Sequence, residues 1–310
     1  MYDLTTTPVK PPAAKAPPRR SSCARATRGM SALLMGTLLI LCMAGCEWAT
    51  PYQSLKSILK TGELTVISRN NANCYYVYRD EPMGFEYELV KAFADHLGVR
   101  LRVQIADQWN DLIPAVLSGK SALIAASMTA TAARKKKIRF SNAYMTIRQH
   151  LIVHRDNFHI NKFEEIGEGA IHVREGTSYQ ERLQHLQRRG HAFRIVLEPN
   201  IPTEELIRRV AMRKIDFTVA DDNVALLNRR YYPQIVISTA LGGHQELAWG
   251  VHPKAHALAA EINRFLEKIQ SDGRYAEIHQ RYYGDVSRFD YVDLRTFHRR
   301  IASRLPKFEA

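Results

Sequence analysis

Two hydroxyl groups and a guanidinium group follow an apolar run near the middle of the chain. Ser127 and Thr129 come after residues 122–126, and Arg134 lies five residues beyond Thr129. An arginine binds a carboxylate through two parallel hydrogen bonds, and hydroxyls and free helix N–H groups complete the shell. These residues form a candidate carboxylate site. The alternative is an ordinary threonine-rich helix start followed by a solvent-exposed basic helix, and the spacing alone favours that alternative.

Two adjacent carboxylates follow another apolar run. Asp221 and Asp222 come directly after residues 217–220 and precede a predicted helix. A carboxylate at the end of a strand can hold an ammonium group, and an aspartate is also a natural N-cap for a helix. We expect one of the two to cap the helix and the other to face a cleft.

Catalytic patterns are missing from the sequence. Glu86 and Glu88 lie two residues apart on a predicted helix, where their side chains do not converge, so we interpret them as helix-surface charges. The chain has no Gly-x-Ser-x-Gly segment and no cysteine and histidine spacing typical of a metal site. The sequence predicts a binding protein with no catalytic residue, metal ion or cofactor.

Apolar runs alternate with amphipathic segments along most of the chain, as in α/β proteins. The predicted strands are 64–67, 101–105, 122–126, 170–173, 193–197, 217–220, 235–238 and 247–251. The predicted helices are 85–97, 112–117, 178–189, 203–214, 222–230 and 258–269. This order predicts α/β architecture in two lobes, each with a mostly parallel sheet flanked by helices.

The last segment exceeds what a second sheet needs, so we expect it to return to the first lobe. Residues 61–149 and 244–285 then form lobe 1, and residues 150–243 form lobe 2. Two crossings, near residues 150–155 and 240–246, act as a hinge. A cleft between two such lobes is a favoured place for a small ligand.

The N-terminus has the composition of an export signal. Basic residues precede an apolar run and the segment Met43-Ala44-Gly45-Cys46, which resembles the lipobox of bacterial lipoproteins. We expect residues 1–45 to be a signal peptide, Cys46 to carry the lipid, and residues 46–60 to be a linker. The alternative is an uncleaved signal anchor. Glu47 after the cysteine resembles the pattern of lipoproteins sent to the outer membrane, so the resemblance implies anchoring in the outer rather than the inner membrane, facing the periplasm.

Cleavage leaves Cys74 as the only unmodified cysteine, which excludes an internal disulfide. The whole chain has a formal charge of +13, and loss of six basic residues and one acidic residue with the signal leaves +8. This charge favours acidic partners such as anionic lipids or cell-wall polymer. No basic run is interleaved with aromatics, so nucleic acid is not expected.

Several ordered motifs resemble family 3 of the extracellular solute-binding proteins, the amino-acid receptors of bacterial importers. They are residues 84–89, 109–120, 127–134 and 140–144, and the resemblance covers about residues 60–285. It implies a two-lobed, periplasmic-binding-protein-like fold with two hinge crossings. Residues 70–80, which contain Cys74, depart from the family pattern, so the resemblance does not carry over side-chain specificity.

The resemblance also implies a set of ligand-binding residues. The positions that match the residues around the ligand's α-carboxylate are Ser127, Thr129, Arg134, Thr177 and Ser178. Asp221, five residues after Asp216, matches the aspartate that binds the α-amino group. Tyr76, with Tyr75 as the alternative, is the expected aromatic partner of the ligand, and Trp109 is a further expected contact.

A second resemblance involves the C-terminus. Residues 289–297, after residues 282–285, resemble the junction in the membrane-bound lytic murein transglycosylases F, where a solute-binding-like module precedes a peptidoglycan-cleaving domain. Residues 286–310 are then a tail that leads to a missing catalytic domain.

Three hypotheses follow. The first is a regulatory module that closes on an amino acid or a peptidoglycan-derived peptide, with a hydrolase domain or peptidoglycan as its partner. The second is a receptor lipoprotein that delivers amino acids to an ABC permease. The third is a truncated lytic transglycosylase.

Overall fold

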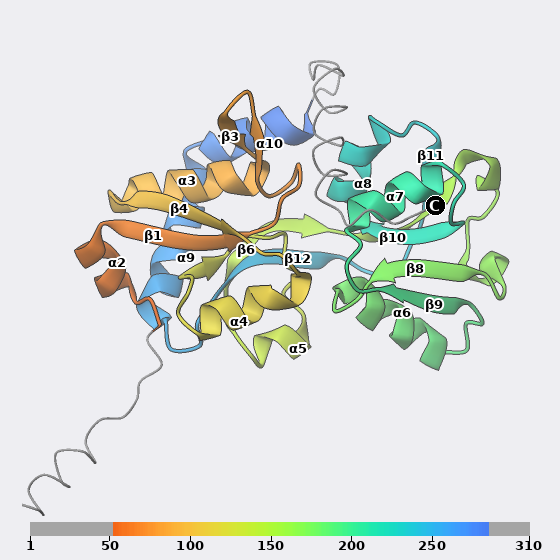
Figure 1. The fold of residues 1–310 in the computed structure, drawn as a ribbon, viewed down its shortest axis with the longest axis horizontal. Coiled ribbons are helices and arrows are strands. Elements are labelled where there is room, and N and C mark those ends of the chain that lie inside the picture. The colour runs from red at the N-terminus through yellow and green to blue at the C-terminus, as the bar shows by residue number, and fades with distance from the viewer. Residues whose placement is uncertain (1–51, 285–310) are drawn as a thin grey trace, which may run out of the picture. The chain divides into compact units, whose positions relative to one another are not determined.

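The computed structural model describes residues 52–284. Two five-stranded sheets organise this part of the chain (Figure 1). The first sheet has the order β4 (Arg100–Ile105), β1 (Glu63–Ser68), β5 (Leu123–Ile124), β12 (Gln245–Val251) and β6 (Arg139–Ile147). The second has the order β11 (Ile235–Ala240), β7 (Gln149–His154), β10 (Phe217–Asp221), β8 (Ala170–Arg174) and β9 (Arg194–Glu198). The strands β2 (Tyr76–Tyr78) and β3 (Glu81–Met83) form a separate hairpin.

The helices cover both faces of each sheet. Those that accompany the first sheet are α2 (Leu55–Thr61), α3 (Phe85–Leu97), α4 (Leu112–Leu117), α5 (Ala132–Lys135), α9 (His256–Ser271) and α10 (Arg274–Tyr283). Those of the second sheet are α6 (Ser178–Arg188), α7 (Thr203–Ala211) and α8 (Asp222–Arg229). Short 3₁₀ turns span Trp109–Asp111, Arg155–Asn157 and Phe163–Ile166.

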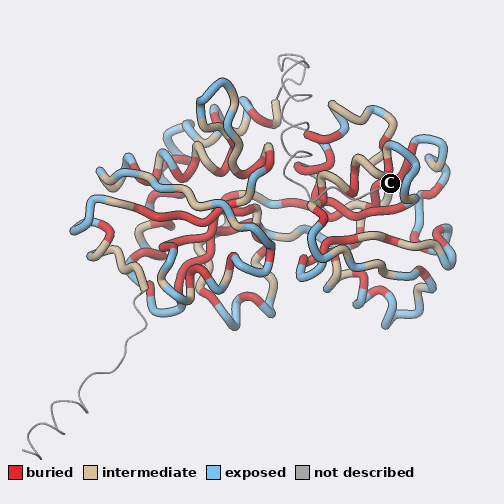
Figure 2. The backbone as a smooth tube through the Cα atoms, viewed as in Figure 1, coloured by how far each residue is buried: buried red, intermediate tan, exposed pale blue. Residues whose placement is uncertain are grey.

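Successive side chains of a strand point to opposite faces of the sheet. Each sheet can therefore pack against helices on both of its faces. In β7, Leu151 and Val153 pack with α6, whereas Ile152 packs with α7 and α8. In β5, Leu123 packs with α3 and α9, and Ile124 packs with α4. The strands β1, β7, β10 and β12 are accordingly buried along most of their length (Figure 2).

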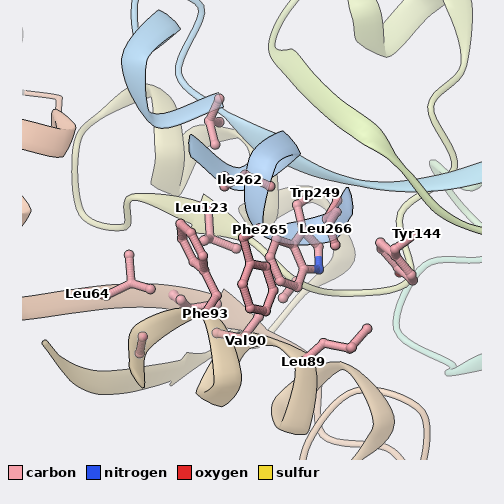
Figure 3. Packing of buried hydrophobic residues seen from close by; sticks show 14 of the residues in the cluster. Leu64, Leu89, Val90, Phe93, Leu123, Tyr144, Trp249, Ile262, Phe265 and Leu266 are labelled. Atoms are coloured by element: carbon pink, nitrogen blue, oxygen red, sulfur yellow. The ribbon is translucent and has the colours of Figure 1, made fainter. Parts of the chain in front are cut away.

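Aromatic residues fill the core of the first lobe. Trp249 of β12 is fully buried and stacks on Phe265 of α9, and Phe93 of α3 lies against both (Figure 3). Aromatic pairs at these separations add to the stabilisation from burial. Because β12 comes from the far end of the chain, this packing holds the returning segment to the first sheet.

The sheets differ from the mostly parallel arrangement that the sequence predicted. Within the described residues, each sheet has two parallel strand pairs and two antiparallel pairs. Parallel neighbours need a long crossover connection, usually a helix. The segments β6–β7 and β11–β12 pass from one sheet to the other without a helix. In each sheet, the strands of these segments pair antiparallel to their neighbours.

The crossings are short. Between β6 and β7 only Arg148 lies outside a strand, so the first crossing is at residue 148 and not at 150–155, which is mostly strand β7. The second crossing is residues 241–244, within the predicted range. The two crossings touch, because the Arg148 guanidinium lies 2.8 Å from Nε2 of His244.

The expected linker of residues 46–60 needs one correction. Helix α2 begins at Leu55, because Ser54 caps it by accepting a hydrogen bond from the Ser57 amide, and Ile58 is buried in the first core. The signal peptide, Cys46 and the tail 286–310 lie outside the described residues. Within residues 52–284, no helix has both the length and the apolar character needed to cross a membrane.

Candidate functional site

A small cavity lies where residues from both lobes meet. It is about 20 Å³ in volume, room for a single water molecule. Six of the residues predicted from the sequence line it, namely Trp109, Ser127, Thr129, Thr177, Ser178 and Asp221. The structure therefore brings together residues that are up to 112 positions apart in the sequence.

Strand ends bring these residues together. Ser127 and Thr129 follow β5, Thr177 and Ser178 follow β8 and begin α6, and Asp221 ends β10. Strands β8 and β10 are parallel neighbours, so their carboxyl ends meet at one edge of the second sheet. Ligands of open α/β sheets bind at such edges.

Glu86 holds Ser127 in an unusual backbone conformation. Ser127 has φ +49, a left-handed value that non-glycine residues seldom adopt. Its amide donates a 2.7 Å hydrogen bond to Oε2 of Glu86, and the Tyr144 hydroxyl donates to Oε1 of the same carboxyl. Glu86 is buried, and this burial raises its pKa to about 7. The interpretation of Glu86 as a surface charge was wrong, because this face of α3 packs under the cavity-lining loop.

Arg134 is buried although its neighbours on the basic run are exposed. Its guanidinium donates to the backbone oxygens of Thr129, at 2.9 Å, and Gly176, at 3.1 Å, and lies 5.1 Å from the centre of the Trp109 ring. Burial lowers its pKa. It is not among the residues that line the cavity. The alternative is correct in part, because Thr131 caps α5 and residues 135–137 are exposed, but Arg134 itself is not solvent-exposed.

Hydrogen bonds join the two lobes directly at the cavity. The Thr129 and Ser178 hydroxyls are 3.2 Å apart, and Nε2 of Gln149 donates to the Ser178 hydroxyl at 2.9 Å. The Trp109 indole N–H donates to the Gly176 oxygen at 2.8 Å, so this oxygen accepts from two side chains of the first lobe. Groups that could bind a ligand are thus engaged with one another.

Asp221 is the carboxylate that faces the cavity. It is 3% exposed, and its Oδ1 has no hydrogen-bond partner among the described residues. Burial raises its pKa to about 7, although a hydrogen bond from Tyr179 acts in the opposite direction. Asp222 points elsewhere and accepts a hydrogen bond from the Arg148 amide at 3.1 Å. Asp221 also occupies the N-cap position of α8, without a side-chain capping bond. The expected division, in which one aspartate caps the helix and the other faces the cleft, is therefore not found.

Three charged residues of the cavity wall were not identified from the sequence: Arg69, Glu204 and Arg174. Arg69 follows β1, forms an ion pair of 3.4 Å with Glu204 at the start of α7, and lies 5.2 Å from the centre of the Trp109 ring. Arg174, the last residue of β8, is the third. Arg69 and Arg174 lie directly after or at the end of a strand, which is the same signal that identified Ser127 and Asp221, whereas Glu204 lies in the first turn of α7.

Tyr76 lies apart from the cavity. It is in β2, where it packs against the first core. In residues 52–284, no group of three histidine, cysteine, aspartate or glutamate side chains is placed to hold a metal ion, and Cys74 is free and buried.

Known proteins share sequence similarity with this chain. Residues 64–285 match the family described as bacterial extracellular solute-binding proteins, family 3. A protein of Desulfosudis oleivorans, named membrane-bound lytic murein transglycosylase F, is 45% identical over 288 residues, which are 92% of this chain and 63% of that protein. The chain therefore spans less than two thirds of the length of this relative.

Solved structures show the same architecture. An ancestral amino acid-binding protein, a precursor of cyclohexadienyl dehydratase, matches with a TM-score of 0.65 and 26% identity, over 74% of this chain and 98% of its own. An ancestral arginine-binding protein bound to arginine matches with a TM-score of 0.65 and 25% identity, over 72% of this chain and 99% of its own. The two-lobed α/β fold is shared with these proteins.

Proposed function

We propose that this chain, which belongs to family 3 of the bacterial extracellular solute-binding proteins, has a non-catalytic binding function. Its two lobes close on a small ligand that has an α-amino and an α-carboxylate group. The observation that carries the proposal is the Oδ1 atom of Asp221, a buried acceptor without a partner, beside a ring of hydroxyl donors. A buried, unpaired carboxylate oxygen is unfavourable, and an ammonium group of a ligand would satisfy it.

In this proposal Asp221 accepts hydrogen bonds from the α-amino group. The α-carboxylate accepts hydrogen bonds from Arg134 and from the hydroxyls of Ser127, Thr129, Thr177 and Ser178. Arg134 now bonds two backbone oxygens, one in each lobe. A space of about 20 Å³ is too small for an amino acid. Separation of the lobes about residues 148 and 241–244 would enlarge it and free Arg134 from Gly176, so binding selects among lobe positions.

We further propose that this module regulates a larger cell-wall enzyme, with peptidoglycan-derived peptides as ligands. The extensive similarity to a protein named as a lytic transglycosylase supports this role. Export, lipidation at Cys46 and anchoring in the outer membrane are part of the same proposal. The similarity to an amino acid-binding protein supports the second candidate, a receptor lipoprotein of an amino-acid importer.

Titration calorimetry with the common amino acids and with wall peptides tests the binding function. We expect at least one of them to bind, Asp221→Asn to weaken it strongly and Arg134→Ala to abolish it. Lys136→Ala is the matched control, because Lys136 is exposed two residues away. Retained affinity in Arg134→Ala would contradict the carboxylate assignment.

The same titrations separate the two candidates. Tighter binding of wall peptides than of any free amino acid favours the regulatory module, and the reverse order favours the importer receptor. Zymography on purified peptidoglycan should give no clearing by this chain. Clearing would refute the non-catalytic assignment.

A further inference from the structure

The charged side chains of the cavity wall are two arginines and two acids, but they do not all pair with one another. Arg69 is paired with Glu204 at 3.4 Å. Arg174 is 7% exposed, its guanidinium forms no hydrogen bond or ion pair with any described residue, and its Nε is buried. Proteins seldom bury a guanidinium in this way, because the charge loses its hydration and gains nothing in return.

Burial and the nearby Arg69 lower the pKa of Arg174 to about 10, with Glu204 acting in the opposite direction. Arg174 therefore remains a cation at neutral pH. Glu204 cannot neutralise both arginines, because it already bonds Arg69.

The proposed amino-acid ligand still leaves Arg174 without a partner. Its ammonium group pairs with Asp221 and its α-carboxylate with Arg134, so those charges cancel. Arg69 and Glu204 also cancel. One positive charge, on Arg174, remains at the cavity.

We propose that the ligand carries a second carboxylate, on its side chain, and that Arg174 binds it. The Nε–H of an arginine and one terminal N–H lie parallel and match the two oxygens of a carboxylate. The unpartnered Nε of Arg174 is one half of that fork. The inference rests on the proposed function and narrows its ligands to acidic amino acids, either free or as a residue of a peptide.

Calorimetry of the unmodified chain with glutamate and glutamine, in both the L and D forms, tests the inference without a mutation. The two side chains have nearly the same shape and differ in charge. We expect one form of glutamate to bind at least tenfold more tightly than the matching glutamine and than L-arginine. A dipeptide containing the same acidic residue distinguishes the free from the peptide source.

The variant Arg174→Gln then locates the effect. Affinity for glutamate should fall at least tenfold while affinity for glutamine changes less than threefold, and Arg174→Lys should recover part of the loss. Arg194→Gln is the matched control, since Arg194 is exposed on the neighbouring strand β9.

Each adverse outcome has a distinct meaning. If glutamine or arginine binds the unmodified chain as tightly as glutamate, the inference fails while the binding function stands. Equal losses for glutamate and glutamine in folded Arg174→Gln also refute it. If no amino acid or acidic peptide binds at all, the proposed function fails together with the inference.

Discussion

The buried carboxyl of Glu86 should make the stability of this protein depend on pH. Burial raises its pKa from 4.5 to about 7, so the folded protein holds this proton more tightly than the unfolded chain does. For an acid with a raised folded pKa, the stabilisation is complete below the unfolded pKa and is lost as pH rises through the folded value. At 1.36 kcal/mol for each pKa unit, a shift from 4.5 to about 7 corresponds to about 3 kcal/mol.

The substitution Glu86→Gln removes this titration and keeps the shape of the protonated side chain. Urea unfolding at about pH 4 and about pH 8 gives the change in unfolding free energy for each protein. We expect the change in the unmodified protein to exceed that in Glu86→Gln by about 3 kcal/mol, with the variant losing less stability at high pH. Asp221 and the other titrating groups contribute equally to both proteins and cancel in the difference.

The matched control is Glu88→Gln, the same chemical change two residues further along α3. Glu88 bonds Tyr282 and Arg281 at the surface of the first lobe, and this variant keeps Glu86. It should retain the part of the pH dependence that Glu86 causes. The reasoning is refuted if Glu86→Gln shows the same change between the two pH values as the unmodified protein.

Two further pairs of substitutions test the core packing and the close approach at a glycine. Phe93→Ala should lower the unfolding free energy by about 3–5 kcal/mol in urea titrations, because Phe93 is fully buried between α3, α9 and β12. Phe158→Ala is the control: its side chain is 68% exposed, and the unfolding free energy should change by less than about 0.5 kcal/mol. Gly176→Ala should lower the melting temperature more than Gly190→Ala: both glycines have positive φ, but only at Gly176 does a Cβ meet another atom, Oδ1 of Asn110 at 2.4 Å. Equal shifts in the two glycine variants would show that backbone strain alone determines the cost.

The sequence predicted the regular elements well where local pattern determines them. Helix α3 runs from Phe85 to Leu97 and ends at Gly98, which has φ +67, as the spacing of its apolar residues and the terminal glycine indicated. The continuous apolar runs became the buried strands β1, β8 and β10. Such runs have few alternatives to a position at the centre of a sheet.

Of the four strands that join the lobes, β11 and β12 were predicted and β6 and β7 were not. Strand β6, Arg139–Ile147, contains few strongly apolar residues, and it begins four residues after the basic helix α5. Its partner in the sheet is β12, about 100 residues away in the sequence. Strand pairing over such a distance decides whether a half-polar segment is extended, and a local pattern carries no information about it.

At the site, the sequence predicted positions better than it predicted interactions. Six predicted residues line one cavity because strand ends must meet where parallel strands stop. The burial of Glu86 could not be predicted, because its carboxyl becomes an internal acceptor only when the Ser127 loop folds over α3. Arg174 directly follows a predicted strand, but the sequence, with 44 basic residues, could not show that its guanidinium would be buried without a partner.

What distinguishes Arg174 and Asp221 is that each has a buried polar atom without a partner within the described residues, and only the fold creates that property. One supplies a buried donor and the other a buried acceptor on the wall of one small cavity. The two side chains do not form an ion pair with each other within 4.0 Å, so each keeps its free atom. An unpaired buried polar group costs about 1–3 kcal/mol, and a ligand with an acceptor at one end and a donor at the other would offset both costs at once. An acidic amino acid, as proposed above, would supply an ammonium group for Asp221 and a side-chain carboxylate for Arg174.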